Sequence, residues 1–207
     1  MLKSLIVLDD VYADPEGMRQ AALRLAYPAP ADGANYAGRN SSAKLLLPDT
    51  DKMLSWAVGQ SLAGAEDRAH GALRLTLAGD RGRYRVHVDT GVEWSGVLYL
   101  SRPEHCQGGT AFFRHRATGT DRAPMDAEEL ARCQFATPQE ALDRILGQDS
   151  NDESRWEALT TIPMRFNRLV LFRPWLWHSA GDGFGDGVEN GRLVQLFFLR
   201  RDRHAGH

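Results

Sequence analysis

Residues 84–89 read Tyr-Arg-Val-His-Val-Asp, and this short stretch decides which fold and which chemistry the sequence predicts. Its residue types are those of a β-strand, and side chains two residues apart on a strand point to the same face. His87 and Asp89 would therefore face one side together. A later Trp-His-Ser at 177–179 offers His178 from a second strand. We expect these three side chains to meet on one side of a metal ion.

Two imidazoles and one carboxylate occupy half of an octahedron, which is the arrangement typical of non-haem Fe(II) oxygenases. The open half can take a co-substrate and O2. The pair alone also fits a His and an Asp on a solvated strand, or a hydrogen-bonded pair. With 27 acidic residues and 7 histidines in 207 positions, chance alone is expected to place an acid two positions after a histidine. Context has to decide between these interpretations.

The composition excludes several classes of protein. A length of 207 residues suits a single domain, and 43% hydrophobic with 25% charged residues is ordinary for a globular protein. A net charge of −2 provides no basic field for nucleic acid or acidic lipid. The first ten residues are too short an apolar run for a signal peptide, and no run approaches the ~18–20 apolar residues that span a membrane. Cys106 and Cys133 form no disulfide framework and no CxxC pair, so reduced thiols and a cytoplasmic location are expected.

Local patterns predict helices first and short strands afterwards. Asp14 and Pro15 are typical of a helix start, and apolar residues at helical spacing follow them. Further helices are expected at 50–63 and at 138–146, and a loop rich in Pro and Gly at 27–38. The strands are expected at 4–8, 72–77, 83–89, 94–100, 109–113, 160–162, 168–172, 175–180 and 192–199.

These elements predict one domain over 1–207 that is mainly β with flanking α. Residues 1–70 would provide an N-terminal strand and supporting helices packed on one face. Residues 71–199 would form the catalytic core, a double-stranded β-helix or cupin-like jelly roll, with an insertion at about 116–157. An eight-stranded jelly roll encloses room for a metal and small ligands. The insertion is where a lid and specificity contacts are expected.

The stretch at 84–89 is followed by five more segments of strand character. They read Gly-Val-Leu-Tyr-Leu at 96–100, Gly-Gly-Thr-Ala-Phe-Phe at 108–113, Phe-Asn-Arg-Leu-Val-Leu-Phe at 166–172, Trp-His-Ser-Ala at 177–180 and Gly-Arg-Leu-Val-Gln-Leu-Phe-Phe at 191–198. In order and spacing this set resembles the 2-oxoglutarate- and Fe(II)-dependent dioxygenases, on the prolyl-4-hydroxylase side of that superfamily. The lead-in Asp-Asp-Val-Tyr at 9–12 also looks like uncharacterised bacterial members.

The resemblance implies roles for particular residues. His87, Asp89 and His178 would bind Fe(II). Arg192, fourteen residues after the second histidine, would bind the distal carboxylate of 2-oxoglutarate through its planar fork. The glycine-rich segment 181–191 accounts for a longer gap than the family usually has. Tyr99 matches a tyrosine that can bind the same carboxylate in relatives, and Tyr84 matches one beside the iron pocket. Both also fit ordinary core aromatics.

Other residues are weaker candidates. His115 has the strand parity of residues 111 and 113, so it either faces the pocket as a substrate contact or lies just past the strand in solvent. Four more residues are considered for the substrate mouth, although structural roles fit them better: Arg39, Arg114, Trp94 and Trp177.

The expected function is therefore a 2-oxoglutarate-, Fe(II)- and O2-dependent hydroxylase. Related halogenases replace the acid of the metal triad with Gly or Ala, so Asp89 favours hydroxylation, or less often desaturation or cyclisation, over halogenation. The substrate would be an amino acid, a carrier-bound amino acid or a peptidyl side chain. A cupin-like metal enzyme without 2-oxoglutarate and a non-catalytic binding protein on the same fold are the alternatives. A structural zinc site is disfavoured because such sites usually have four ligands. The oligomeric state stays open, with a homodimer as one option.

Overall fold

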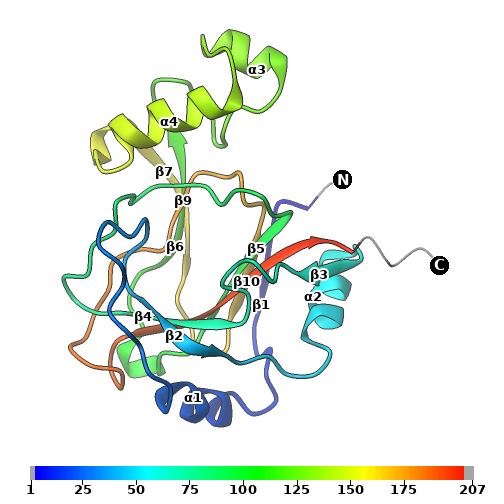
Figure 1. Ribbon diagram of the computed structural model, residues 1–207, viewed down its shortest axis with the longest axis vertical. Coiled ribbons are helices and arrows are strands. Elements are labelled where there is room, and N and C mark those ends of the chain that lie inside the picture. The colour runs from blue at the N-terminus through cyan, green and yellow to red at the C-terminus, as the bar shows by residue number, and fades with distance from the viewer. Residues whose placement is uncertain (1–2, 203–207) are drawn as a thin grey trace.

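Two antiparallel β-sheets form the centre of the protein, as the computed structural model shows for residues 3–202 (Figure 1). The larger sheet contains, in spatial order, β1 (Leu5–Leu8), β8 (Leu169–Phe172), β5 (Trp94–Tyr99), β10 (Arg192–Arg201), β4 (Ala72–Thr76) and β2 (Arg39–Lys44), with β3 (Leu62–Gly64) also paired to β10. The smaller sheet has the order β7 (Trp156–Pro163), β6 (Gly109–His115) and β9 (His178–Ser179).

The outer face of the larger sheet is covered by two helices, α1 (Pro15–Leu23) and α2 (Thr50–Val58). Strand β8 shows how the sequence directs this packing, because its side chains alternate between faces. Leu169 and Leu171 point outward into the cluster that contains the helix residues. Val170 and Phe172 point inward, toward the smaller sheet. Burial on both faces explains why this strand is an uninterrupted apolar run.

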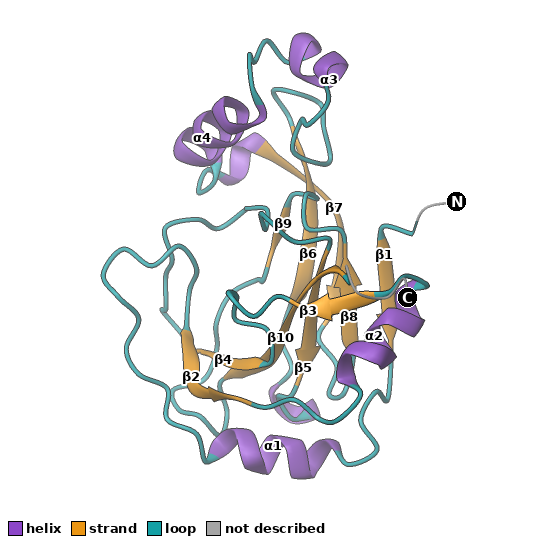
Figure 2. Ribbon diagram, turned by 45° about the vertical axis from the view of Figure 1, so that its right-hand side comes forward, coloured by secondary structure: helices purple, strands orange, loops and turns teal. Residues whose placement is uncertain are grey.

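Residues between β6 and β7 form a separate helical lobe, with α3 (Ala127–Arg132) and α4 (Pro138–Asp149). It lies at the opposite end of the molecule from α1 (Figure 2). Its apolar side chains Leu142 and Ile145 pack with Trp156 and Trp177, and with the two valines of the 84–89 stretch. The lobe therefore packs against the side of the 84–89 stretch that carries the two valines.

The predicted mainly β architecture, with helices on one face, is confirmed. Asp14 caps α1 by accepting a hydrogen bond from the Gly17 backbone N–H at 2.8 Å. Helix α2 ends at Val58, earlier than predicted, because Gly59 adopts φ 77° and terminates it in the left-handed region. The predicted strand at 175–180 shrinks to two residues, whereas α3, β2 and β3 were not predicted.

The predicted strand at 83–89 is wrong. Only one isolated bridge forms there, between His87 and His178. The backbone N–H groups of this stretch bond in turn to Ala34, Asn35, Ser150, His178 and Pro174, so it threads between segments and joins no sheet. Between residues 3 and 202, no helix combines the length and apolar character that crossing a membrane requires.

Candidate metal centre

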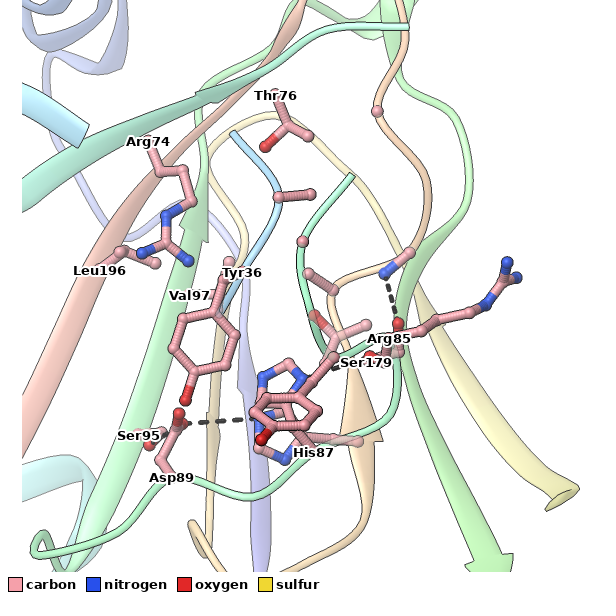
Figure 3. Close-up of a pocket in the computed structure, with 18 of the residues that line it drawn as sticks. Tyr36, Arg74, Thr76, Arg85, His87, Asp89, Ser95, Val97, Ser179 and Leu196 are labelled. Atoms are coloured by element: carbon pink, nitrogen blue, oxygen red, sulfur yellow. Dashed lines mark hydrogen bonds and ion pairs between the residues drawn. The ribbon is translucent and has the colours of Figure 1, made fainter. Parts of the chain in front are cut away.

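A cavity of about 380 Å³ opens between the two sheets. Its walls come from β4, β5, β6, β8, β9 and β10, and its rim from the loops near residues 36, 82 and 182. The volume lies at the lower end of the ~300–1,000 Å³ range of small-ligand sites. His87, Asp89 and His178 line it together, and Figure 3 shows the labelled members of the site converging from separate segments.

One ligand atom from each of these three residues lies within 4.8 Å of the other two. His87 and His178 occupy opposing positions of the isolated bridge, with reciprocal backbone hydrogen bonds of 2.9 and 3.0 Å. Directly opposed residues of an antiparallel pair put their side chains on the same face. Their ring centroids are accordingly 4.4 Å apart. The geometry thus brings all three predicted metal ligands together, although one of the expected strands is missing.

The backbone also selects the tautomer of both imidazoles. His87 Nδ1 lies 3.2 Å from the Arg85 carbonyl oxygen, and His178 Nδ1 lies 2.8 Å from that of Leu176. A carbonyl oxygen can only accept, so each Nδ1 carries the proton and each Nε2 keeps a free lone pair. This is the arrangement in which metal-binding histidines are held by their outer neighbours.

Charge at the site suits a cation. Burial, reinforced by His178, lowers the pKa of His87 to about 3, so this ring is neutral at neutral pH. Burial opposes ionisation of Asp89, but the two imidazoles and the Ser95 hydroxyl outweigh it and lower the pKa of that carboxyl. Ser95 Oγ donates to Asp89 Oδ2 at 2.6 Å, and His178 Nε2 lies 3.5 Å from the same oxygen. Two imidazoles and one carboxylate form a donor set that fits Fe(II).

Arg192 begins β10 on the inward face that it shares with Leu196 and Phe198, both of which line the cavity. The guanidinium is fully buried, and its Nε and Nη2 have no hydrogen-bond acceptor among the described residues. It lies one layer beyond the cavity lining, opposite Thr76 on β4 and 5.9 Å from the Tyr99 ring. Burial lowers the pKa of this guanidinium. A buried cation without a counter-charge is costly unless a ligand supplies one.

The other predicted residues divide into two groups. Tyr84 lines the cavity, whereas Tyr99 lies behind it and shares a 2.7 Å hydrogen bond with Thr110, which does line it. His115 faces neither pocket nor solvent: it is buried between Thr118 and Asp149, at 3.0 Å from each. The four residues considered for the mouth are also absent from the lining, as their structural roles predicted: Arg39, Arg114, Trp94 and Trp177.

Sequence reasoning missed two residues of the cavity wall, Tyr36 and Arg74. The Tyr36 ring lies 4.5 Å from that of His87, and the Arg74 guanidinium lies 5.5 Å from the Tyr36 ring. Arg74 had a readable signal, because in Ala-Leu-Arg-Leu-Thr at 72–76 it shares strand parity with Thr76 and lies on the face opposite the two leucines. The insertion at 116–157 was expected to provide a lid, but it hardly reaches the cavity. Of the described lining residues, only Asn151 comes from it.

Several solved structures share this fold. HygX from Streptomyces hygroscopicus, solved with nickel, 2-oxoglutarate and hygromycin B bound, is 15% identical with a TM-score of 0.52, and the match covers 98% of this chain and 84% of HygX. AviO1 from Streptomyces viridochromogenes Tue57 is 15% identical with a TM-score of 0.51, covering 99% of this chain and 92% of AviO1. SnoK, a non-heme alpha-ketoglutarate-dependent carbocyclase from nogalamycin biosynthesis, is 10% identical with a TM-score of 0.50, covering 100% and 86%.

At these identities the likeness shows the fold alone. Comparison with curated protein sequences gave no match. One family model does match, over residues 2–199, and it describes a family of unknown function. The match includes the cluster of His87, Asp89 and His178 and both sheets, apart from the last two residues of β10. The chain therefore belongs to the DUF6445 family.

Proposed function

We propose that this protein is a 2-oxoglutarate- and Fe(II)-dependent oxygenase. The observation that carries the proposal is the cluster of His87, Asp89 and His178 at the wall of a small-ligand cavity. Both imidazoles keep Nε2 free, and the carboxylate is held ionised, so the set is ready to bind a divalent metal on one side.

Arg192 supports 2-oxoglutarate as the co-substrate. Its buried, unpartnered guanidinium would receive the distal carboxylate, and the Tyr99–Thr110 hydroxyl pair lies beside it. A cupin-like metal enzyme without 2-oxoglutarate would have no use for this cation. HygX, which has the same fold, binds nickel and 2-oxoglutarate.

Different residues of this chain would bind the metal and orient the co-substrate. His87, Asp89 and His178 would hold the metal on three sites and leave the others to co-substrate and O2, while Arg192 would orient the co-substrate. When bound, the iron and 2-oxoglutarate supply the oxidising power that breaks a substrate C–H bond. Val97, Leu196 and Phe198 would keep water from that bond.

Three finer expectations belong to this proposal. The two sheets would constitute a double-stranded β-helix, which is consistent with the neighbours of the same fold. The relation to the prolyl-4-hydroxylase side rests on the sequence resemblance. With Asp89 in place, hydroxylation is the proposed outcome, on an amino acid, a carrier-bound amino acid or a peptidyl side chain.

Succinate release provides the test. Protein loaded with Fe(II) under O2 should convert 2-oxoglutarate to succinate, slowly without substrate and faster with it. His178→Ala should abolish this conversion, whereas the buried but remote His115→Gln variant should retain it. A folded wild-type protein that binds neither Fe(II) nor 2-oxoglutarate would favour the non-catalytic alternative. Binding of metal without 2-oxoglutarate would favour the cupin-like one.

A further inference from the structure

We propose that Arg74 binds the carboxylate of the molecule that is oxidised, so that the substrate is a small monocarboxylic acid with an apolar body. This inference rests on the proposed function, and it names a residue and a substrate class for the same site. It starts from Arg74, a cation in the cavity wall that is additional to Arg192 and to which the proposed function assigns no contact with the metal or the co-substrate.

Arg74 is presented to the cavity in a fixed orientation. It lies on the inward face of β4, and its Nε donates to Asn40 Oδ1 at 2.8 Å. That bond leaves the two terminal nitrogens for a ligand. The plane of the guanidinium lies beside the Tyr36 ring, and Figure 3 shows both side chains directed at the space next to Asp89. A planar pair of N–H donors matches a carboxylate.

No carboxylate within residues 3–202 forms an ion pair with Arg74. Asp89 is the acid whose charge acts on it. However, Asp89 already accepts a hydrogen bond from Ser95 and belongs to the metal cluster, so the metal would balance its charge. Arg85 of the rim differs, because it pairs with Glu153 at 3.0 Å and Asp182 at 3.6 Å. Arg81, also on the rim, donates to the Asp80 carbonyl oxygen at 2.9 Å.

Charge balance predicts what Arg74 is for. A divalent metal, Asp89, Arg192, Arg74 and the dianion of 2-oxoglutarate would leave one positive charge uncompensated in the interior. Imidazoles that bind a metal are neutral, so the two histidine ligands do not change this balance. Uncompensated buried charge is costly, and a substrate with a single negative charge removes the cost.

The positions of the two arginines assign them to different ligands. Arg192 is buried beside Thr76, which lines the cavity, so it would bind the co-substrate at the interior end of the cavity. Arg74 lines the cavity and also the adjoining hollow under the loop at 28–40, so it is nearer the entrance. A molecule that enters after the co-substrate meets Arg74 first.

Size and lining narrow the substrate further. A cavity of about 380 Å³ has room for a small molecule beside 2-oxoglutarate, and Val97, Phe172, Leu196 and Phe198 give it an apolar wall. Of the three substrate forms considered, only a free acid keeps its α-carboxylate. A carrier-bound amino acid holds it as a thioester, and an internal peptide residue as an amide.

Matched acids and amides test the proposal by binding, independently of turnover. Protein loaded with Mn(II) and 2-oxoglutarate would be titrated by calorimetry with phenylacetate and N-acetyl-L-leucine, which carry one negative charge, and with the neutral primary amide of each. We expect wild type to bind at least one acid about tenfold or more tighter than its amide. Arg74→Gln should lose this preference but bind Mn(II) and 2-oxoglutarate as wild type does.

Two further variants keep the test decisive. Arg74→Lys retains the charge and should retain part of the preference for the acid. It provides a second test of the proposal if the glutamine variant does not fold. Arg114→Gln removes an arginine that pairs with Glu157 at 3.5 Å and lies outside the cavity lining, so it should leave the preference unchanged. The proposal is overturned if wild type prefers no acid, if Arg74→Gln keeps the preference, or if that variant loses 2-oxoglutarate binding instead. Failure of wild type to bind 2-oxoglutarate with Mn(II) would separately reject the proposed function.

Discussion

Neighbouring groups orient the three side chains of the metal cluster through hydrogen bonds, and this orientation affects the affinity for a metal. The carbonyls of Arg85 and Leu176 hold the two imidazoles in the tautomer that frees Nε2. Ser95 keeps the Asp89 carboxylate turned toward them. Because metals bind tightly where outer contacts orient the ligands, the cluster should select a divalent ion without large rearrangement.

Replacing the acid should separate metal binding from folding. Loss of an outer contact alone typically costs about 10–100-fold in metal affinity, so loss of a ligand should cost at least that much. Asp89→Ala should therefore bind Mn(II) more than about tenfold more weakly, and it should release no succinate. Asp182→Ala, which removes an exposed carboxylate from the rim of the same cavity, is the matched control. Equal Mn(II) affinity in Asp89→Ala and wild type would refute the ligand assignment.

Arg192 should show opposite effects on stability and on binding. In the ligand-free protein its buried guanidinium has no acceptor for Nε and Nη2, so it destabilises the folded state. Arg192→Met keeps the volume without the charge and should raise the free energy of unfolding by about 1 kcal/mol or more. Stabilisation by added 2-oxoglutarate should disappear. Denaturant unfolding with and without 2-oxoglutarate measures both, and a variant that is less stable yet still responds to 2-oxoglutarate would count against this role.

At the scale of elements, the segment that supplies two metal ligands depends on its surroundings. It forms no strand of its own, and Ser150 at the end of α4 makes three hydrogen bonds to it, one of them from the Val86 N–H to the Ser150 carbonyl at 3.2 Å. The Ser150 hydroxyl accepts from the Arg85 N–H at 3.0 Å and donates to the Val86 carbonyl at 2.8 Å. The helical lobe thus positions His87 and Asp89 through their backbone.

Loosening α4 should consequently weaken the metal site from a distance. Ile145 packs with Val86 and Val88, which flank His87. Ile145→Ala should lower the free energy of unfolding by about 2–5 kcal/mol and also reduce Mn(II) affinity. Gln148→Ala, on the exposed face of the same helix, should change stability by less than about 0.5 kcal/mol. If Ile145→Ala binds Mn(II) as tightly as wild type, the lobe does not position the ligands.

The elements also show what sequence patterns can predict. Continuous apolar runs such as 169–172 and alternating stretches such as 94–99 were recognisable because burial on sheet faces dictates their residues. The 84–89 stretch has strand composition, yet its hydrogen bonds go to segments far apart in sequence, which no local pattern encodes. Tyr36 was unpredictable for the same reason: only the contact of its loop with residues 82–84 brings it to His87. Arg74, by contrast, could have been read from its parity on β4.

At the scale of the whole molecule, several buried groups tie stability to pH. His70 joins α2 to β10: its Nε2 lies 3.0 Å from Asp51 Oδ1, and its Nδ1 accepts from the Phe198 N–H at 3.1 Å. Burial lowers the pKa of His70 even though Asp51 opposes the shift. Burial also lowers the pKa of His87, to about 3. Both rings are thus neutral in the folded protein at a pH where an unfolded chain would already hold their protons.

The metal-free protein should therefore lose stability in mild acid. The unfolded histidines take up protons as pH falls below about 6.5, whereas the folded ones do so only at lower pH, so stability is complete above that pH and declines below it. Each such histidine contributes a slope of up to about 1.4 kcal/mol per pH unit. His70→Gln, which keeps a polar side chain without this titration, should lower the overall stability but flatten the slope between pH 5 and 6. Urea unfolding at a series of pH values measures how the free energy of unfolding depends on pH. Equal slopes for wild type and His70→Gln would show that His70 is not the group responsible.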